Sequence, residues 1–598
     1  MQEVPKRNEL PQQYTWNLEA IYPDETLWEA DWQAVKESIP KLEGFRGTLG
    51  GSPDQLLGCL ELRDETHKRT DQLVVYSRMR KDEDNGNSRY QALADRAMVL
   101  ATELSSASAF IGPEILALPE EKLWGFLATE SRLGLYRHHL EELLRQRPHV
   151  RSTEVEMVLA QSMEISRTPD NTYGMLTNAD MKFPTIQGEG GLPVELSQAR
   201  YNHLRESQDR RVRKDAFQAM HQSYQGFRNT VASSLSGSVR SDIFYSRTRS
   251  YPTALEAALE PNSIPTTVYH NLIETVNRNL SSLHRYMALR ARLLGLEELH
   301  HYDLYVPMVA DVKLEMPYEE AVETVEAAFA PLGEEYLSAL KDGLASRWVD
   351  VYENEGKTSG AYSSGAYTTN PYVLLNYQGT LNDVFTLAHE LGHSMHSYFT
   401  RKTQPYVYGD YTIFLAEVAS TLNEALLTDY LLKQSVDRKL QAYLVNQQME
   451  RIRTTLFRQT MFAQFELEIH SWVESGQALT PDLLSSRYAE LNARYYGSGV
   501  VPDEEIAIEW ARIPHFYWAF YVYQYATGVS AATALANQIL TEGEPAVQRY
   551  LHFLKSGSSD YSINLLRQAG VDMASPEPVQ QALDKFDALT DQMEELTA

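Results

Sequence analysis

The stretch TLNDVFTLAHELGHSMHSYFT, residues 380–400, contains two histidines that bracket a glutamate in the pattern His-Glu-x-x-His. Apolar residues recur through it at helical spacing, and Thr380 with Asp383 three residues later forms a capping box that predicts the helix start. On this helix His389 and His393 lie four residues apart on one face, so both imidazoles can reach one tetrahedral ion. The stretch therefore predicts a metal site on a buried helix.

A third ligand has to be found, because a short motif of this kind also arises by chance on a helix with two unrelated histidines. His396 lies seven residues after His389, which places the two ~10 Å apart along a straight helix. Atoms bound to one zinc ion lie within ~3.5 Å of each other, so His396 is excluded as a ligand. We interpret His396 as a second-shell or substrate-side group, with a packed core histidine as the alternative.

The segment YTIFLAEVASTLNEALLTD, residues 411–429, is the best source of the third ligand. Its apolar pattern leaves Glu417 and Glu424 aligned, seven residues apart, on a polar face of a second helix. Since unpaired buried charge is costly, we predict Glu417 as a metal ligand and Glu424 as an outer-shell acceptor for a ligand imidazole. A solvated acidic face is the alternative.

Composition limits the class of protein. The chain has 598 residues, 43% of them hydrophobic, enough for one large enzyme body. A formal net charge of -27 repels nucleic acids and anionic lipids, and neither a leader nor a run of eighteen apolar residues is visible. The single cysteine, Cys59, suits a reducing compartment. These features predict a cytoplasmic protein whose partners are small solutes or peptides, and they leave its oligomeric state undetermined.

Most of the chain has the periodicity of amphipathic helices. One helix is expected over 131–147, and a long one is expected from Pro265, which is suited to a first helical position. Short strands are expected around 173–186 and 359–377, where apolar and polar residues alternate. The predicted fold class is therefore mainly α-helical, with a small β-sheet or hairpin beside the His-Glu-x-x-His helix.

The glycine-rich turn at 188–191 is the best candidate for a domain boundary. It divides the chain into an N-terminal helical domain, 1–190, and a catalytic domain, 191–598. No repeat or long linker divides the chain further.

Several stretches together resemble one family of enzymes. HELGHSMH (389–396) followed by AEVASTLNE (416–424) resembles the zinc peptidases of the thimet oligopeptidase superfamily. SGAYSSGAY (359–367), IPHFYWAFYVYQYATG (513–528) and TWNLEAIY (15–22) are similar to patterns of bacterial oligoendopeptidase F. The resemblance extends over nearly the whole chain.

This resemblance implies a metal centre and a reaction. It implies that His389, His393 and Glu417 hold one Zn²⁺ per chain, and that Glu390 is the general base acting on a zinc-activated water. It also implies a large helical body with a zincin-like catalytic core, which encloses a deep channel that admits oligopeptides.

The same resemblance places a histidine and a tyrosine from the IPHFYWAFYVYQYATG stretch at the reaction intermediate. His515 with Tyr523 is the preferred pairing. Helical spacing instead groups Tyr517, Tyr521 and Tyr525, with Tyr523 on the opposite side, so Tyr521 is a rival. We assign Tyr517 to the substrate side, and plain packing is the alternative for each of these tyrosines.

The SGAYSSGAY stretch offers small residues and free backbone groups. We expect it to bind the substrate main chain by strand addition, which gives broad side-chain tolerance. Its alternative role is a hairpin that braces the zinc helix. The residues assigned to substrate binding are Gly360, Ala361, Tyr362, Gly365 and Ala366.

The predicted function is a zinc-dependent endopeptidase that hydrolyses internal bonds of short oligopeptides. One alternative is a carboxydipeptidase of the same superfamily, in which Arg512 or Arg494 would hold the substrate carboxylate. Another is a non-catalytic zinc-containing protein that binds peptides, but a closed structural site has no use for a base such as Glu390.

Overall fold

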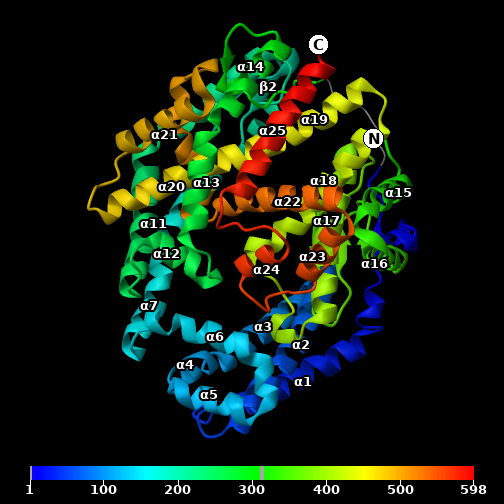
Figure 1. Ribbon diagram of the computed structural model, residues 1–598, viewed down its shortest axis with the longest axis vertical. Coiled ribbons are helices and arrows are strands. Elements are labelled where there is room, and N and C mark those ends of the chain that lie inside the picture. Colours follow the sequence, from blue (N-terminus) through cyan, green and yellow to red (C-terminus); the bar gives the residue numbers. More distant parts are fainter. Residues whose placement is uncertain (1–2, 310–314) are drawn as a thin grey trace. The chain divides into compact units, whose positions relative to one another are not determined.

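The computed structural model describes residues 3–309 and 315–598, and it confirms the mainly α-helical fold (Figure 1). Strands in these ranges are short and form three small sheets. No helix in the described residues is long and apolar enough to cross a lipid bilayer.

The chain forms two compact units, each assembled from segments far apart in sequence. Unit 1 comprises Met1–Arg147, Lys313–Leu431 and Leu535–Val571, and unit 2 comprises Pro148–Val312, Leu432–Ala534 and Asp572–Ala598. The expected boundary after residue 190 lies inside unit 2, so the compact units follow a different division. The domains 1–190 and 191–598 stay a prediction.

Unit 1 begins with three helices that pack side by side, drawn in blue in Figure 1. Its helices are α1 (Glu25–Glu43), α2 (Pro53–Glu83), α3 (Ser88–Ser108), α4 (Ile111–Leu116), α5 (Glu120–Thr129), α6 (Arg137–Gln146), α15 (Tyr318–Ala328), α16 (Gly333–Ala345), α17 (Leu381–Thr403), α18 (Ile413–Gln434, up to Leu431), α23 (Glu544–Leu554) and α24 (Ser562–Gln568).

Unit 2 is likewise helical, and α22 (Tyr523–Glu542) contributes to both units. Its other helices are α7 (Thr153–Ser166), α8 (Thr168–Met175), α9 (Gln198–Leu204), α10 (Arg210–Gln225), α11 (Arg228–Thr248), α12 (Ala254–Leu259), α13 (Thr266–Arg278), α14 (Leu280–Leu294), α19 (Arg438–Ile452), α20 (Arg458–Glu474), α21 (Pro481–Tyr496) and α25 (Glu577–Leu596). Two small sheets, β1 (Thr185–Gln187) with β2 (Pro193–Glu195) and β3 (Leu299–His300) with β7 (Val500–Val501), complete it.

The sheet of unit 1 lies directly before α17 in the chain. Its order is β4 (Val349–Asp350), β6 (Tyr372–Leu374), β5 (Tyr362–Ser364), with β4 parallel and β5 antiparallel to β6. The strands predicted within 359–377 are therefore confirmed as β5 and β6. β5 is an edge strand, and one of its sides faces α17.

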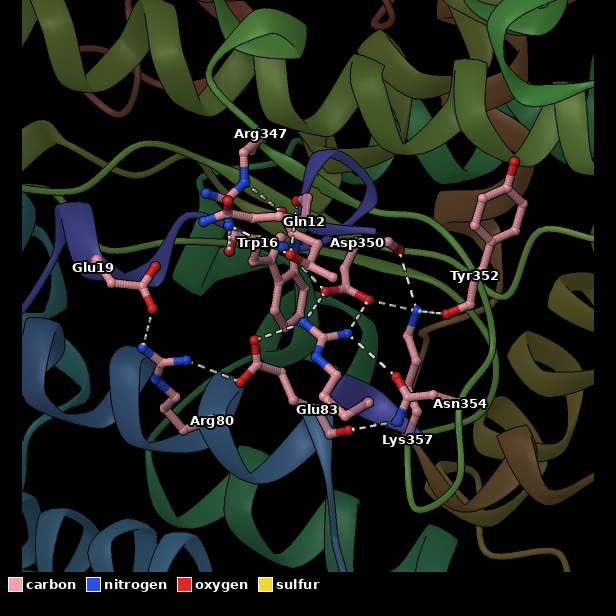
Figure 2. Close-up of polar contacts among 12 residues, drawn as sticks. Gln12, Trp16, Glu19, Arg80, Glu83, Arg347, Asp350, Tyr352, Asn354 and Lys357 are labelled. Carbon is pink, nitrogen blue, oxygen red and sulfur yellow. Dashed lines mark hydrogen bonds and ion pairs between the residues drawn. The ribbon is translucent and has the colours of Figure 1, made fainter. Parts of the chain in front are cut away.

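The N-terminal segment is anchored on this sheet, as Figure 2 shows. The Trp16 indole Nε1 donates a 2.8 Å hydrogen bond to the carbonyl of Val373 in β6, and the Trp16 backbone N–H donates to Asp350. Asp350 is fully buried and also pairs with Arg7 and with Lys357. Burial raises the pKa of Asp350, but Arg7 and Lys357 outweigh it, so the pKa lies below its ordinary value. The tryptophan of TWNLEAIY thus ties the start of the chain to the sheet.

One expected strand differs from the structure. Residues 173–180 complete α8 and form a π-helical turn, so the strand expected at 173–186 overlaps β1 (Thr185–Gln187) only at its last two residues. Side chains from α11 and η15 (Pro514–Tyr517) pack on α8, and this tertiary packing overrides the local alternation.

Two expected helices are broken. Pro265 is the N-cap, not the first helical residue, and the long helix is interrupted at Asn279 between α13 and α14. Residues 131–136 form a 3₁₀ turn before α6. In both cases the apolar periodicity continues across the interruption, so it does not detect the break.

Candidate functional site

α17 has the boundaries and the cap that its sequence predicts. It begins at Leu381, and Thr380 and Asp383 form the reciprocal capping box. One apolar side of the helix is buried, whereas His389 and His393 remain partly accessible on another side. The helix therefore presents both imidazoles from a fixed support.

α18 crosses α17 in direct backbone contact at Gly392. A Cβ at Gly392 would lie 2.5 Å from the Cα of Ser420 and 2.8 Å from the carbonyl oxygen of Ala419. Asn423 on α18 strengthens the crossing by donating a 3.2 Å hydrogen bond to the carbonyl of Ala388. Only glycine permits this approach, which brings the carboxylates of α18 to the histidines of α17.

The three predicted ligands converge. Glu417 Oε2 lies 3.4 Å from His389 Nε2 and 3.7 Å from His393 Nε2, and the two Nε2 atoms are 3.2 Å apart. All three donor atoms lie within 4.8 Å of one another. Two imidazoles and a carboxylate at this spacing fit a tetrahedral zinc ion with an open fourth position.

Glu424 contacts the far side of one imidazole. Its Oε1 lies 2.6 Å from Nδ1 of His389, and the carboxylate is almost fully buried. Because the carboxylate accepts a hydrogen bond from Nδ1–H, the proton of the neutral ring stays on Nδ1, and Nε2 keeps its lone pair toward Glu417 and His393. This is the contact expected of an outer-shell acceptor.

Glu390 lies beside this cluster and is buried. Burial is the main cause of a pKa above the ordinary range; neighbouring His389 lowers that pKa and Glu417 raises it. A backbone hydrogen bond from Ser363 in β5 also reaches the carboxylate. A carboxyl with a raised pKa is suited to accepting and returning a proton.

His396 packs in the core, which favours the packed-histidine alternative over the interpretation as a second-shell group. It is fully buried, stacks flat on Tyr411 at 3.6 Å between ring centroids, and touches Phe553. Neither ring nitrogen has a hydrogen-bond partner among the described residues. Burial, and after it His393, lower the pKa of His396 to about 3, so the ring is neutral. Its distance from the ligands along the helix excludes metal binding. Its packing could not be predicted in the same way, because its stacking partners lie on other segments of the chain.

The residues assigned to substrate binding divide into two groups. Gly360 and Ala361 line a cavity of about 260 Å³ next to the first turn of α17. In contrast, the Tyr362 hydroxyl donates to Asp82 at 2.7 Å, and Ala366 is buried. Contacts of these last two residues with a peptide would therefore use the main chain, as strand addition requires.

Gly365 also belongs to this strand region. A Cβ there would lie 2.8 Å from the carbonyl oxygen of Asn370 and from Nη1 of Arg401. The glycine is therefore needed for the close packing of the hairpin.

In unit 2, the segment after Pro514 brings together an aromatic group. The His515 ring lies 6.3 Å from Tyr521 and 6.1 Å from Tyr525, between ring centroids, and 5.1 Å from Trp518. Burial lowers the pKa of His515, which favours the neutral imidazole. His515 and Tyr521 therefore lie close together on one segment of the chain.

Tyr523 packs against another part of unit 2, and its pairing with His515 at the reaction intermediate stays a prediction. Tyr523 is buried, and its ring lies 5.2 Å from that of Tyr269. α22 begins only at Tyr523, so Tyr517 and Tyr521 precede the helix and do not share a helical face with Tyr525. The periodicity argument assumed a helix where the chain forms a 3₁₀ turn and a reversal.

Tyr517 stacks on Tyr173 of α8 at 4.5 Å between ring centroids. This contact gives Tyr517 a packing role inside unit 2. Its assignment to the substrate side stays a prediction.

The two arginines considered as carboxylate holders in the carboxydipeptidase alternative lie in different environments. Arg512 pairs with Glu509 at 3.3 Å and lies over the ring of Tyr201. Arg494 is exposed on α21. Arg512 already has a buried partner, so it is a poor holder for a substrate carboxylate.

Sequence reasoning missed the carboxylate beside His300 and His301. Asp503 accepts from the His301 backbone N–H and lies 2.7 Å from His300 Nδ1. This cluster ties β3 to the end of β7. It also missed the role of Gly392, although a glycine inside a helical pattern is a known signal of close backbone approach.

Comparisons with known proteins agree with the arrangement. The model of peptidase family M3 matches residues 203–585, and the model of oligopeptidase F matches residues 114–183. The boundary expected after residue 190 lies between these two matches.

Similar proteins extend over the whole chain. It is 51% identical to oligopeptidase PepF of Bacillus subtilis over 99% of this chain and 89% of that protein. It is 41% identical to group B oligopeptidase PepB of Streptococcus agalactiae over 99% and 98% of the two chains.

Solved structures give the same result. A putative peptidase from Chlamydophila abortus has a TM-score of 0.95 at 37% identity, covering 99% of this chain and 100% of the other. The oligoendopeptidase-F of Enterococcus faecium has a TM-score of 0.74 at 40% identity, covering 96% and 99%. The chain is thus a peptidase, and it belongs to the oligoendopeptidase F group of peptidase family M3.

Proposed function

We propose that this peptidase is a zinc-dependent endopeptidase that cleaves internal bonds of short oligopeptides in the cytoplasm. The observation that carries the proposal is the convergence of His389, His393 and Glu417, whose donor atoms lie within 4.8 Å of one another, beside buried Glu390. Cys59 is buried and free, which is compatible with a reducing compartment.

His389, His393 and Glu417 would hold the ion, and Glu424 would orient His389. A zinc ion bound there supplies a Lewis acid that polarises the substrate carbonyl and lowers the pKa of water. The remaining chemistry falls to the side chains of this chain.

Glu390 is the proposed general base. Its carboxylate takes a proton from the attacking water and then delivers that proton to the leaving amine. Its buried position raises its proton affinity, which favours the first step, the uptake of the proton from water. Hydrogen-bond donors are also needed for the oxyanion, and His515 and Tyr521 are the proposed donors.

Substrate binding is assigned to β5. An edge strand leaves backbone groups free, so a peptide can add to the sheet without regard to most of its side chains. Small residues at Gly360 and Ala361 leave room beside the first turn of α17. A channel that admits only short peptides stays a prediction from the family resemblance.

The test is cleavage of a doubly capped, fluorescence-quenched peptide by wild type and by Glu390→Gln, both verified to contain zinc. Blocked ends prevent exopeptidase action, so wild-type cleavage supports an endopeptidase. Glu390→Gln keeps the shape of the side chain but loses the base, and we expect kcat to fall about 10²–10⁴-fold. Cleavage of free-ended peptides alone, releasing dipeptides, would instead favour the carboxydipeptidase.

A further inference from the structure

The segment that carries His515 and Tyr521 reverses direction at Phe520 in a strained conformation. Phe520 has a φ of +53°, in the left-handed region that bulky residues rarely adopt. Such a conformation persists only where the surroundings hold it in place, and it is common at functional sites. Contacts from outside the turn must therefore stabilise this conformation of Phe520.

One hydrogen bond from a distant helix holds it. The Phe520 backbone N–H donates to Glu466 Oε1 on α20 at 2.7 Å, across 54 residues of sequence. The Phe520 ring is buried, with Tyr269 at 5.6 Å and His470 at 4.6 Å between ring centroids. The amide is thus fixed by Glu466 and the ring by its neighbours.

The environment of Glu466 shows that this bond is its main polar contact. The side chain is fully buried, and Oε2 has no hydrogen-bond partner among the described residues. Burial raises the pKa of Glu466 to about 8, so the carboxyl is largely neutral near pH 7. It acts there as a hydrogen-bond acceptor, not as a charge.

The neighbouring histidine does not change this conclusion. His470 Nδ1 faces the carbonyl oxygen of Glu466 at 2.8 Å, and its Nε2 faces Asp242 Oδ2 at 3.2 Å. Both partners are acceptors, so both nitrogens carry protons. Asp242 balances the resulting positive charge, so the Glu466 carboxyl remains available to accept the hydrogen bond from the Phe520 N–H.

A buried carboxyl with one satisfied oxygen is costly for the fold. An apolar side chain of similar size would fill the same space without that cost. The retained polar group therefore indicates that the single bond to Phe520 has a use beyond packing. Phe520 directly precedes Tyr521, and its conformation sets how Tyr521 lies relative to His515.

We propose that Glu466 is a positioning residue, which holds the Phe520 turn so that His515 and Tyr521 keep the mutual geometry needed for peptide hydrolysis. This proposal rests on the proposed endopeptidase function. Glu466 acts through the backbone of Phe520 and touches no reacting atom.

The test compares three variants on α20. Glu466→Leu removes the acceptor but keeps the volume, and Glu466→Gln keeps a neutral acceptor of the same shape. Glu468→Leu is the matched control, because Glu468 lies two residues away and pairs with Arg487 without contacting the turn. Zinc content, kcat and KM on the capped peptide, and hydrogen exchange of the segment 514–525 are measured for each.

Glu466→Leu should bind zinc normally, exchange faster in 514–525, and lose about tenfold to hundredfold in kcat, since small misplacements cost this much. KM should change little. Glu466→Gln and Glu468→Leu should match wild type in both exchange and kcat.

Unchanged exchange in Glu466→Leu would overturn the proposal whatever the activity. If Glu466→Leu does not fold, Glu466→Gln provides the test. The glutamine keeps the acceptor for the Phe520 N–H, so fast exchange and low kcat in a folded, zinc-loaded Glu466→Gln variant would also overturn the proposal. If wild type cleaves no capped peptide, the endopeptidase proposal fails. The hydrogen exchange of the segment 514–525 still shows, independently of activity, whether Glu466 stabilises the Phe520 turn.

Discussion

His389 and His393 lie four residues apart within one regular helix, whereas His515 and Tyr521 lie on an irregular segment that reverses at Phe520. In the helix, backbone hydrogen bonds repeat every turn, so sequence spacing translates directly into direction. In the irregular segment, the direction of each side chain depends on the local backbone dihedral angles and on contacts with distant residues. Spacing therefore predicts how the candidate metal ligands converge, but it does not predict where the tyrosines lie.

The largest expected effect comes from disrupting the pair of helices, α17 and α18, that carries the proposed metal centre. Gly392→Ala places a methyl group against the backbone of Ser420, so α18 must move and Glu417 and Glu424 move with it. We expect loss of bound zinc and of activity, together with a destabilisation of about 1–3 kcal/mol from overpacking. Zinc analysis and denaturant unfolding measure both.

Gly125→Ala is the matched control for that variant. Gly125 lies in α5 with no atom within 4 Å of an added Cβ, so alanine should stabilise the helix by roughly 1 kcal/mol and leave zinc in place. Full zinc content in Gly392→Ala would show that the close crossing does not govern the site.

The next effect separates the two tyrosines. Tyr521→Phe should lower kcat by about 10²–10³-fold if its hydroxyl stabilises the oxyanion. Tyr523→Phe should leave kcat near wild type, because the ring packs on Tyr269. Steady-state kinetics of zinc-loaded variants decides, and the opposite order would restore the pairing of His515 with Tyr523.

A smaller effect tests how Glu424 supports the metal centre. Glu424→Gln keeps the side-chain shape, but its amide is a weaker acceptor for His389 Nδ1–H. We expect zinc affinity to fall about 10–100-fold, with activity restored by excess zinc. Competition with a chelator measures the affinity; an unchanged value would reduce Glu424 to a packing residue.

The smallest effect concerns His396, the histidine of the motif that packs in the core. His396→Phe removes two buried nitrogens without partners and retains a ring to stack on Tyr411. Zinc and activity should be unchanged, and the free energy of unfolding should stay equal or rise by about 1 kcal/mol. Loss of zinc in this variant would contradict its placement away from the ligands.

Particular residues show where sequence reasoning succeeds. The Thr380–Asp383 box and the start of α17 are determined by neighbours in the chain, and the structure has both. Glu417 and Glu424 were identified because two aligned carboxylates on a largely apolar helix need partners. Their geometry follows from helix periodicity and the cost of burying charge.

Other features depend on contacts between distant segments. The strand expected at 173–186 became mostly helical turn, and the helix expected from Pro265 broke at Asn279. Local patterns are compatible with more than one backbone path, and packing selects among them.

The sequence by itself determined the mainly helical class, the helix that carries His389 and His393, its cap and the identity of the candidate ligands, because these depend on the spacing of residues within one helix. Only the tertiary structure decided that Gly392 admits α18, that His396 is buried, that Tyr521 lies near His515 and that Tyr523 packs on Tyr269. The physical reason is that each of these depends on a contact between segments distant in the chain, such as the 54-residue bond from Phe520 to Glu466.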